Sequence, residues 1–287
     1  EAAAAGHQPW VLCGVPAGQP APPVRGLPAD RVRTVTFGDG GDLPFPVPGM
    51  SDVMPYRSTV WSAMTASQLA LYRDTWRDRL AAAVRWARPD LVHCNHLWLV
   101  SALAPAVLDG VPSVAHCHAT GLRQMALCPH LRDEVAAGLQ EHRAFVVLHD
   151  EHARRVREDL GIPADRIHEV GAGYTDTLFH RSGSPDTADR AGQVLYVGKY
   201  AAAKGLPWLL DACEARWRAG DGFTLHVAGD GRGEEAEALR ARMIALAPRV
   251  ELHGRLGQAD LAGLMRRGAV LVLPSFYEGL PDRKSVV

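Results

Sequence analysis

The stretch that decides the fold is QVLYVGKYAAAKGLPWLLDA, residues 193–212. An apolar run ends at Gly198 and Lys199, and Gly205 comes just before a helical pattern. Pro207 falls in the first turn of that pattern, where the missing N–H of proline breaks no hydrogen bond. The stretch therefore predicts a buried strand, a turn and a helix, which together form the repeating unit of a parallel α/β sheet.

The same unit recurs along most of the chain. Apolar runs alternate with stretches of helical period, such as residues 150–160, which Asp150 is expected to cap and Gly161 and Pro163 to end. A longer helical pattern covers residues 69–84 and ends before Pro89. We predict strands at residues 10–15, 91–94, 111–117, 145–149, 167–170, 194–198, 225–228, 250–253 and 270–273. Apolar strands separated by helices are typical of parallel sheets covered on both faces.

The composition excludes several classes of function. The 287 residues carry 31 Lys and Arg against 32 Asp and Glu, a formal charge of −1, so no basic surface for nucleic acid is expected. The 5 cysteines are too few for a disulfide framework and predict a reducing, cytoplasmic location. The length predicts two domains. A polar seam at residues 181–189 divides them into two Rossmann-like domains, 1–181 and 182–287.

Four predicted strand ends carry reactive groups. Ligands of open parallel sheets bind beyond the carboxyl ends of the strands, so these positions matter most. They hold His118, the pair Lys199 and Lys204, the glycine-rich turn 229–233, and Glu278 within residues 273–281. Each has an ordinary explanation alone: a structural histidine, solvated lysines, a common turn, a helix-capping carboxylate. Their joint occurrence at successive strand ends favours a ligand site. Two ammonium groups beside a helix N-terminus suit a diphosphate.

Five segments in this order resemble a known family. They are residues 193–212, HVAGDG at 226–231, VELHGR at 250–255, LPSFYEGLP at 273–281, and HATGLRQ at 118–124. The chain from about residue 85 to residue 281 resembles the family-four retaining glycosyltransferases that use nucleotide sugars. The resemblance implies an α/β GT-B fold, with two Rossmann-like domains whose parallel sheets face a central cleft.

The resemblance also implies a mechanism. A nucleotide diphosphate sugar would be the donor, and the developing charge on its leaving diphosphate would be stabilised by Lys199 and Lys204. His118 and Glu278 would be the catalytic residues. No metal and no cofactor would be needed, because the two lysines supply the positive charge. The acceptor would be a sugar, a glycan or a lipid-linked molecule.

The donor sugar is expected to contact both domains. His118 would approach the transferred sugar from the N-terminal domain. Its hydroxyl groups would be held by the carboxylate of Glu278 and by the backbone N–H groups of Gly279 and Leu280. The family transfers with retention and without an apparent covalent intermediate, so no nucleophile is assigned.

Several positions depart from the family pattern. Lys199 stands where arginine is usual, which keeps the charge but loses the bidentate fork. Val286 occupies the place of a second glutamate that binds the nucleotide ribose. Residues 282–287 do not continue as an apolar helix, and the family's first strand should precede Glu1. We therefore expect a fragment truncated at both ends, with a non-native last segment and little activity.

Three further hypotheses stay open from the sequence. The irregular stretch around Asp52 and Tyr56 either shapes the acceptor pocket or is an ordinary surface loop. Metal binding by the histidines and cysteines between residues 93 and 130 is disfavoured, because their spacings fit no common zinc module. The alternative functions are a GT-B nucleotide-sugar epimerase and a non-catalytic sugar-nucleotide-binding protein. Peripheral contact with the inner membrane face is left open by the resemblance.

Overall fold

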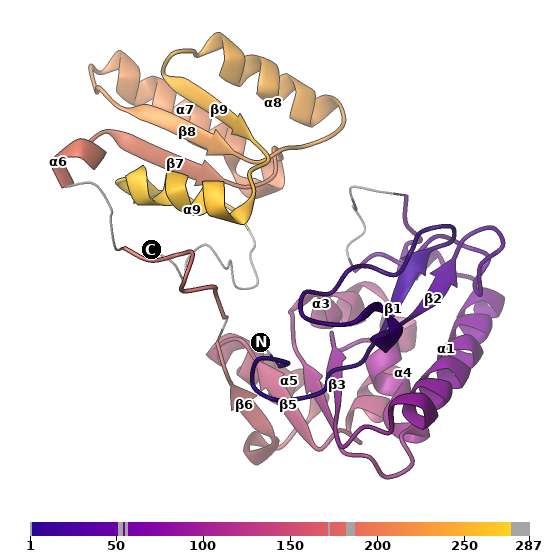
Figure 1. Ribbon diagram of the computed structural model, residues 1–287. Coiled ribbons are helices and arrows are strands. Elements are labelled where there is room, and N and C mark those ends of the chain that lie inside the picture. Colours follow the sequence, from indigo (N-terminus) through magenta and orange to yellow (C-terminus); the bar gives the residue numbers. More distant parts are fainter. Residues whose placement is uncertain (1, 51–53, 55–56, 172, 182–186, 277–287) are drawn as a thin grey trace. The chain divides into compact units, whose positions relative to one another are not determined.

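The computed structural model describes residues 2–50, 54, 57–171, 173–181 and 187–276 (Figure 1). The chain divides into two compact units, Glu1–Gly171 and Ala172–Val287. The sequence placed the domain boundary later, after residue 181, next to residues 182–186, which lie outside the described part. Each unit is described separately below.

The N-terminal unit contains two parallel sheets. Strand β1 (Val11–Pro16) pairs with β2 (Val32–Phe37), and a four-stranded sheet has the order β3 (Val92–Asn95), β4 (Ser113–His116), β5 (Ala144–Val147), β6 (Ile167–Glu169). All of these pairings are parallel. The helices of this unit are α1 (Ala66–Ala87), α2 (Leu99–Leu103), α3 (Thr120–Leu127), α4 (Pro129–Leu139) and α5 (Asp150–Leu160).

Helix α1 follows its predicted pattern. Its buried residues are Leu69, Tyr72, Trp76 and Leu80, at spacings of three and four. The side chain of Thr65 caps the helix by accepting from the N–H of Gln68, and Gln68 in turn accepts from the N–H of Thr65. The helix therefore begins at a defined residue and packs one apolar face into the core of the N-terminal unit.

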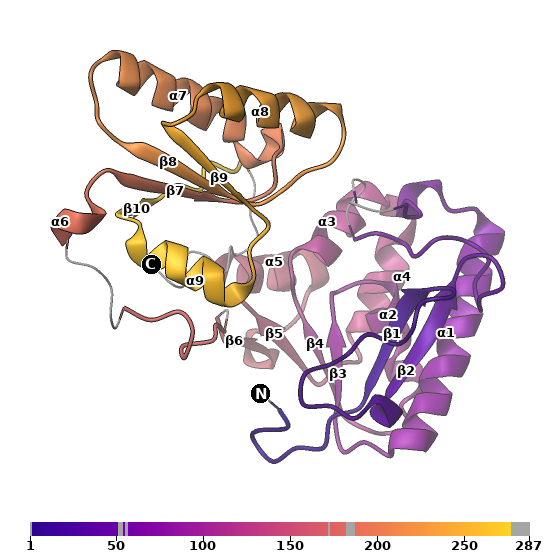
Figure 2. The same cartoon turned by 45° about the horizontal axis from the view of Figure 1, so that its top comes forward.

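The C-terminal unit is one parallel sheet with helices on both faces. The strand order is β10 (Val270–Leu271), β7 (Gln193–Val197), β8 (Thr224–Ala228), β9 (Val250–Gly254). Helices α7 (Leu206–Arg218) and α8 (Glu234–Ala245) cover one face, and α9 (Gln258–Arg267) covers the other (Figure 2). The short α6 (Thr187–Arg190) precedes β7. The expected α/β fold with parallel sheets is confirmed in both units.

The strands agree with the sequence prediction except at β2. Each of the nine predicted strands has a counterpart, whereas β2 lies in a Pro- and Gly-rich stretch for which no strand was predicted. A second difference concerns α5, where His149 occupies the N-cap position and Asp150 is the first helical residue. The Asp150 carboxylate accepts from the N–H of Glu151, so it does not cap the helix in the expected way.

No helix in the described part of the chain is long and apolar enough to cross a membrane.

Candidate functional site

Four histidine rings gather at the carboxyl ends of β3 and β4. The ring centroids of His116 and His118 lie 4.1 Å apart, those of His93 and His116 5.4 Å apart, and those of His96 and His118 4.9 Å apart. Alternation along a strand predicts that His116 and His118 share a face, and their stacking agrees with this. His118 lies just beyond the end of β4, in the loop that leads to α3.

Hydrogen bonds and backbone geometry hold this cluster in place. Nε2 of His118 donates to Oδ1 of Asn95 at 3.0 Å, because an amide oxygen can only accept. Nδ1 of His96 contacts the hydroxyl of Thr120, also at 3.0 Å. His96 and Ala119 both have positive φ, 67° and 63°, a conformation that non-glycine residues adopt rarely.

Burial favours the uncharged form of two imidazoles in this cluster, His116 and His96. The pKa of His116 is lowered to about 4, first by desolvation and then by its neighbours His118 and His93. Desolvation, with a smaller effect of His116, also lowers the pKa of His96. Neutral imidazoles can donate and accept hydrogen bonds but do not attract anions. This part of the site therefore suits hydroxyl groups better than phosphate.

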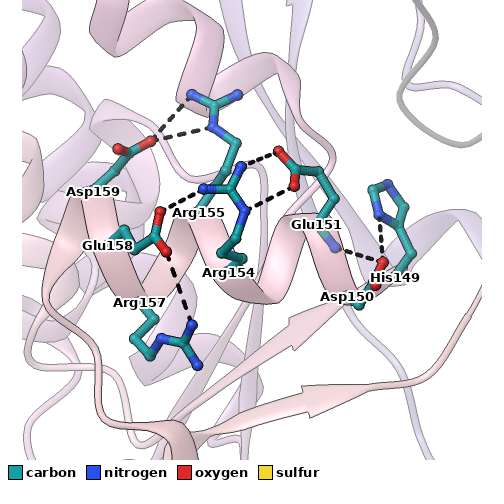
Figure 3. A network of polar contacts seen from close by, with 8 residues as sticks. All are labelled: His149, Asp150, Glu151, Arg154, Arg155, Arg157, Glu158 and Asp159. Atoms are coloured by element: carbon teal, nitrogen blue, oxygen red, sulfur yellow. Dashed lines mark hydrogen bonds and ion pairs between the residues drawn. The ribbon is translucent and has the colours of Figure 1, made fainter.

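Helix α5 carries two more histidines at the carboxyl end of the neighbouring strand, β5. The rings of His149 and His152 lie 3.9 Å apart at its N-terminus, and burial, ahead of the nearby charges, lowers the pKa of His152 to about 4. Ion pairs connect the exposed side chains of α5 to one another (Figure 3). Arg154 pairs with Glu151 at 2.6 Å and with Glu158 at 2.5 Å, spacings of one helical turn. Exposed pairs of this kind are screened by water and contribute little to the stability of the helix.

In the C-terminal unit, the loop after β7 carries both predicted lysines. We call residues 198–205 the lysine loop. Its start is fixed by the buried Tyr196, whose hydroxyl donates to the carbonyl of Lys199 at 2.6 Å. Lys199 is exposed, and Lys204 lies half-buried one residue before Gly205, the N-cap of α7. The N–H of Ala202 donates to the carboxylate of Glu235 at 2.8 Å, so a backbone donor of this loop already binds an anionic group.

The lysine loop meets the segment that follows β10. Gly205 has φ 71°, and a Cβ there would overlap the carbonyl of Pro274. The N–H of Phe276 donates to the carbonyl of Ala203 at 3.3 Å, and its ring packs edge-on against Trp208, with centroids 4.8 Å apart. The chain therefore runs along the lysine loop up to the last described residue, two positions before Glu278.

The glycine-rich turn after β8 packs against the same loop. A Cβ on Gly229 would overlap the carbonyl of Gly198, so the two backbones approach as only glycine allows. The N–H of Tyr200 donates to the carbonyl of Asp230 at 3.1 Å, and the Asp230 carboxylate pairs with Arg240. The turns after β7 and β8 thus pack closely against each other at the carboxyl edge of this sheet, where ligands of α/β sheets bind.

The predicted site residues fall into three groups. His118 lies in the N-terminal unit, and Lys199 and Lys204 lie together in the C-terminal unit. The remaining predicted residues fall outside the described part of the chain: Glu278, Gly279, Leu280, Asp52 and Tyr56.

Sequence reasoning missed several supporting residues. It counted His96 only among the metal candidates and gave Asn95, Thr120 and His152 no separate role. The signal that could have identified them is their position, because each lies within three residues of the end of a predicted strand.

Two family profiles match the chain. The profile described as "Glycosyltransferase Family 4" matches residues 1–176, and the one described as "Glycosyl transferases group 1" matches residues 191–282. Among curated proteins, the alpha-D-kanosaminyltransferase of Streptomyces kanamyceticus is 26% identical over 82% of this chain and 64% of its own length. The glycogen synthase of Mycobacterium tuberculosis is 28% identical over 96% of this chain and 66% of its own length. The chain thus spans about two thirds of the length of these relatives.

Solved structures of glycosyltransferases share the fold. Anabaena HepE in complex with UDP has a TM-score of 0.59 at 15% identity, covering 94% of this chain and 75% of its own. The sucrose-phosphate synthase of Thermosynechococcus elongatus has a TM-score of 0.58 at 14% identity, covering 94% and 76%.

Parallel sheets with reactive groups at their carboxyl ends, and this likeness, define the fold class as GT-B. The chain belongs to glycosyltransferase family 4.

Proposed function

We propose that this protein transfers a sugar from a nucleotide diphosphate sugar to an acceptor, with retention of configuration at the anomeric carbon. The observation that carries the proposal is the lysine loop, where Lys199 and Lys204 both precede the start of α7 in a turn held by glycine contacts. HepE, whose structure holds UDP, and the two curated relatives support a donor of this class.

The proposed chemistry follows from the charges. The bond between the anomeric carbon and the diphosphate oxygen breaks, and its electron pair leaves with the diphosphate. The ammonium groups of Lys199 and Lys204 and the N-terminus of α7 stabilise that negative charge, so the step as proposed needs no metal. The acceptor oxygen then bonds to the anomeric carbon and gives its proton to an oxygen of the departing diphosphate. Retention places the new bond on the face that the diphosphate leaves.

Other residues are assigned by role within the same proposal. His118, held by Asn95, contacts the transferred sugar as a hydrogen-bonding imidazole. Glu278, with the N–H groups of Gly279 and Leu280, holds the sugar hydroxyls. Asp52 and Tyr56 belong to an acceptor loop. The acceptor is a sugar, a glycan or a lipid-linked molecule, and a cytoplasmic location suits a nucleotide-sugar donor.

The test is donor turnover by the full-length protein carrying Lys204→Ala. With UDP-, GDP- and ADP-sugars as donors, we expect kcat/KM to fall about 100- to 1,000-fold, the usual cost of one lost charge-stabilising donor. The matched control is Arg218→Ala, which removes an exposed positive charge at the other end of α7.

Two results would contradict the proposal. If Lys204→Ala keeps the turnover of the parent, the lysine loop does not hold the diphosphate. If the parent epimerises the donor sugar, or binds it without transfer to any acceptor in a glycan panel, the protein is an epimerase or a binding protein instead. His118→Ala is expected to lower turnover while leaving the Kd for the free nucleotide diphosphate unchanged.

A further inference from the structure

A second group of reactive side chains lies on β8 and β9, apart from the lysine loop. His226 stands opposite Glu251 in the parallel register, and His253 follows two residues later, at an irregularity in the pairing of β9 with β8. Nδ1 of His226 is 3.0 Å from Nε2 of His253 and 3.3 Å from Oε2 of Glu251. In the described part of the chain, this is the group of three ligand atoms found within 4.8 Å of one another.

These separations fit the coordination shell of a transition metal. With bonds of about 2.0–2.1 Å, the ligands of a tetrahedral zinc ion lie roughly 3.3–3.4 Å from one another. The two measured separations from Nδ1 of His226 come close to that value without rearrangement. Two imidazoles and a carboxylate also form the donor set that divalent transition metals prefer over Mg²⁺ or Ca²⁺.

Gln193 on β7 sets the orientation of the His226 ring. The amide oxygen of Gln193 can only accept, so Nε2 of His226 carries the proton in their hydrogen bond. In the neutral ring this leaves a lone pair on Nδ1, which faces a carboxylate oxygen and a second imidazole. Metal-binding histidines are typically held in this way, with the distal N–H bonded to a neighbouring acceptor.

The surroundings leave room for an ion to enter. β9 is the edge strand of its sheet, and the side chain of Glu251 is 55% exposed against 12% for His226. Water can therefore reach a fourth coordination position. Arg267, at the end of α9, adds positive charge near His226. This charge lowers the affinity of the group for a metal cation.

We propose that His226, Glu251 and His253 bind one divalent transition-metal ion of the Zn²⁺ type. Gln193 acts as a positioning residue for His226, and water completes the shell. The ion clamps the edge strand β9 to β8. The site lies outside the lysine loop and does not depend on the proposed glycosyl transfer.

The experiment measures ZnCl₂ binding to the full-length, chelator-stripped protein by calorimetry, with MgCl₂ as the comparison ion. We expect Zn²⁺ to bind with at least 100-fold preference over Mg²⁺ and to raise the Tm of the C-terminal unit. His253→Ala should weaken the Zn²⁺ affinity of this site at least 100-fold, and Gln193→Ala about 10- to 100-fold. Co²⁺ should give the visible absorption of a tetrahedral site in the parent and lose it in His253→Ala.

Two control variants keep the result interpretable. His180→Ala removes an exposed histidine of the same unit outside the group and should leave binding unchanged. Glu251→Gln keeps the shape of the side chain, so a loss of binding there reports the missing carboxylate charge and not a folding defect. Equal Zn²⁺ stoichiometry and affinity in the parent, His253→Ala and Glu251→Gln would overturn the proposal. So would a Zn²⁺ affinity no greater than that for Mg²⁺.

Discussion

His152 shows how burial sets chemistry at a single residue. Its side chain is 3% exposed, yet Nδ1 finds no hydrogen-bond partner among the described residues. Desolvation, then the charges of His149 and Arg155, lower the pKa of His152 from its usual value near 6.5 to about 4. His116 in the neighbouring cluster is shifted in the same direction, also to about 4. The fold therefore holds both rings neutral.

These shifts predict a pH-dependent stability of the N-terminal unit. As pH falls from 6.5 to 4, the unfolded chain binds protons at His116 and His152 that the folded chain does not, so the free energy of unfolding decreases. Above pH 7 these two residues do not make the free energy of unfolding depend on pH. Denaturant unfolding at pH 7.5, 6, 5 and 4.5 measures this, and His152→Leu should flatten the fall between pH 6.5 and 4.

The control for this prediction is His168→Leu on β6, where the side chain is exposed. This variant should keep the pH profile of the parent. If His152→Leu loses as much stability on acidification as the parent does, burial of His152 is not the cause of the slope.

At the residue scale, the sequence identified charge-bearing groups better than their partners. The positions of Lys199, Lys204 and His118 at strand ends follow from local patterns, which is why they could be predicted. The contact between His118 and Asn95 joins the loop after β4 to the end of β3, and the group of His226 and His253 depends on strand register. Register is set by packing of the whole sheet, and a single sequence does not reveal it.

At the scale of the elements, the junction between β7 and α7 is tightly constrained. Gly205 combines a left-handed backbone with direct contact against Pro274, whereas Gly220 also has positive φ, 99°, but no atom near its missing Cβ. Gly205→Ala should therefore cost several kcal/mol of unfolding free energy in the C-terminal unit. Gly220→Ala should cost only the roughly 1–2 kcal/mol of backbone strain.

Urea unfolding followed by hydrogen exchange of the backbone amides of β7 and β8 compares the two variants in the C-terminal unit. Equal losses for Gly205→Ala and Gly220→Ala would mean that the contact with Pro274 does not constrain the junction. A larger loss for Gly205→Ala would show that backbone contact, beyond φ alone, demands glycine there.

Element prediction succeeded where the local signals were consistent. Helix α7 begins with a proline in its first turn and α5 ends at Gly161 in the left-handed conformation, as the sequence indicates. Strand β2 was missed although Val32, Val35 and Phe37 are apolar, because prolines and glycines surround it on both sides. Its pairing with β1 is a long-range contact that overrides the loop-like composition.

At the scale of the whole molecule, the described chain has separate hydrophobic cores in its two units. The core of the N-terminal unit draws on residues from Val35 to Ile162, and those of the C-terminal unit on residues from Leu195 to Leu264. Separate cores predict two unfolding transitions. Leu139→Ala in α4 and Leu210→Ala in α7 remove equivalent side chains, each fully buried in its own unit.

Each of these substitutions should cost about 2–5 kcal/mol and lower the Tm of one transition while leaving the other in place. Differential scanning calorimetry shows the two transitions, and hydrogen exchange assigns them to the units. A single transition that both variants lower equally would contradict independent cores.

The order of the last sheet also has a consequence for synthesis. Because β10 pairs with β7, the first strand of the C-terminal sheet receives its second neighbour only after residue 271 has left the ribosome. Every pairing in this sheet is parallel and needs a crossover, so no hairpin can form first. The edge of β7 is thus open throughout translation of this unit, when an unpaired strand is most exposed to aggregation.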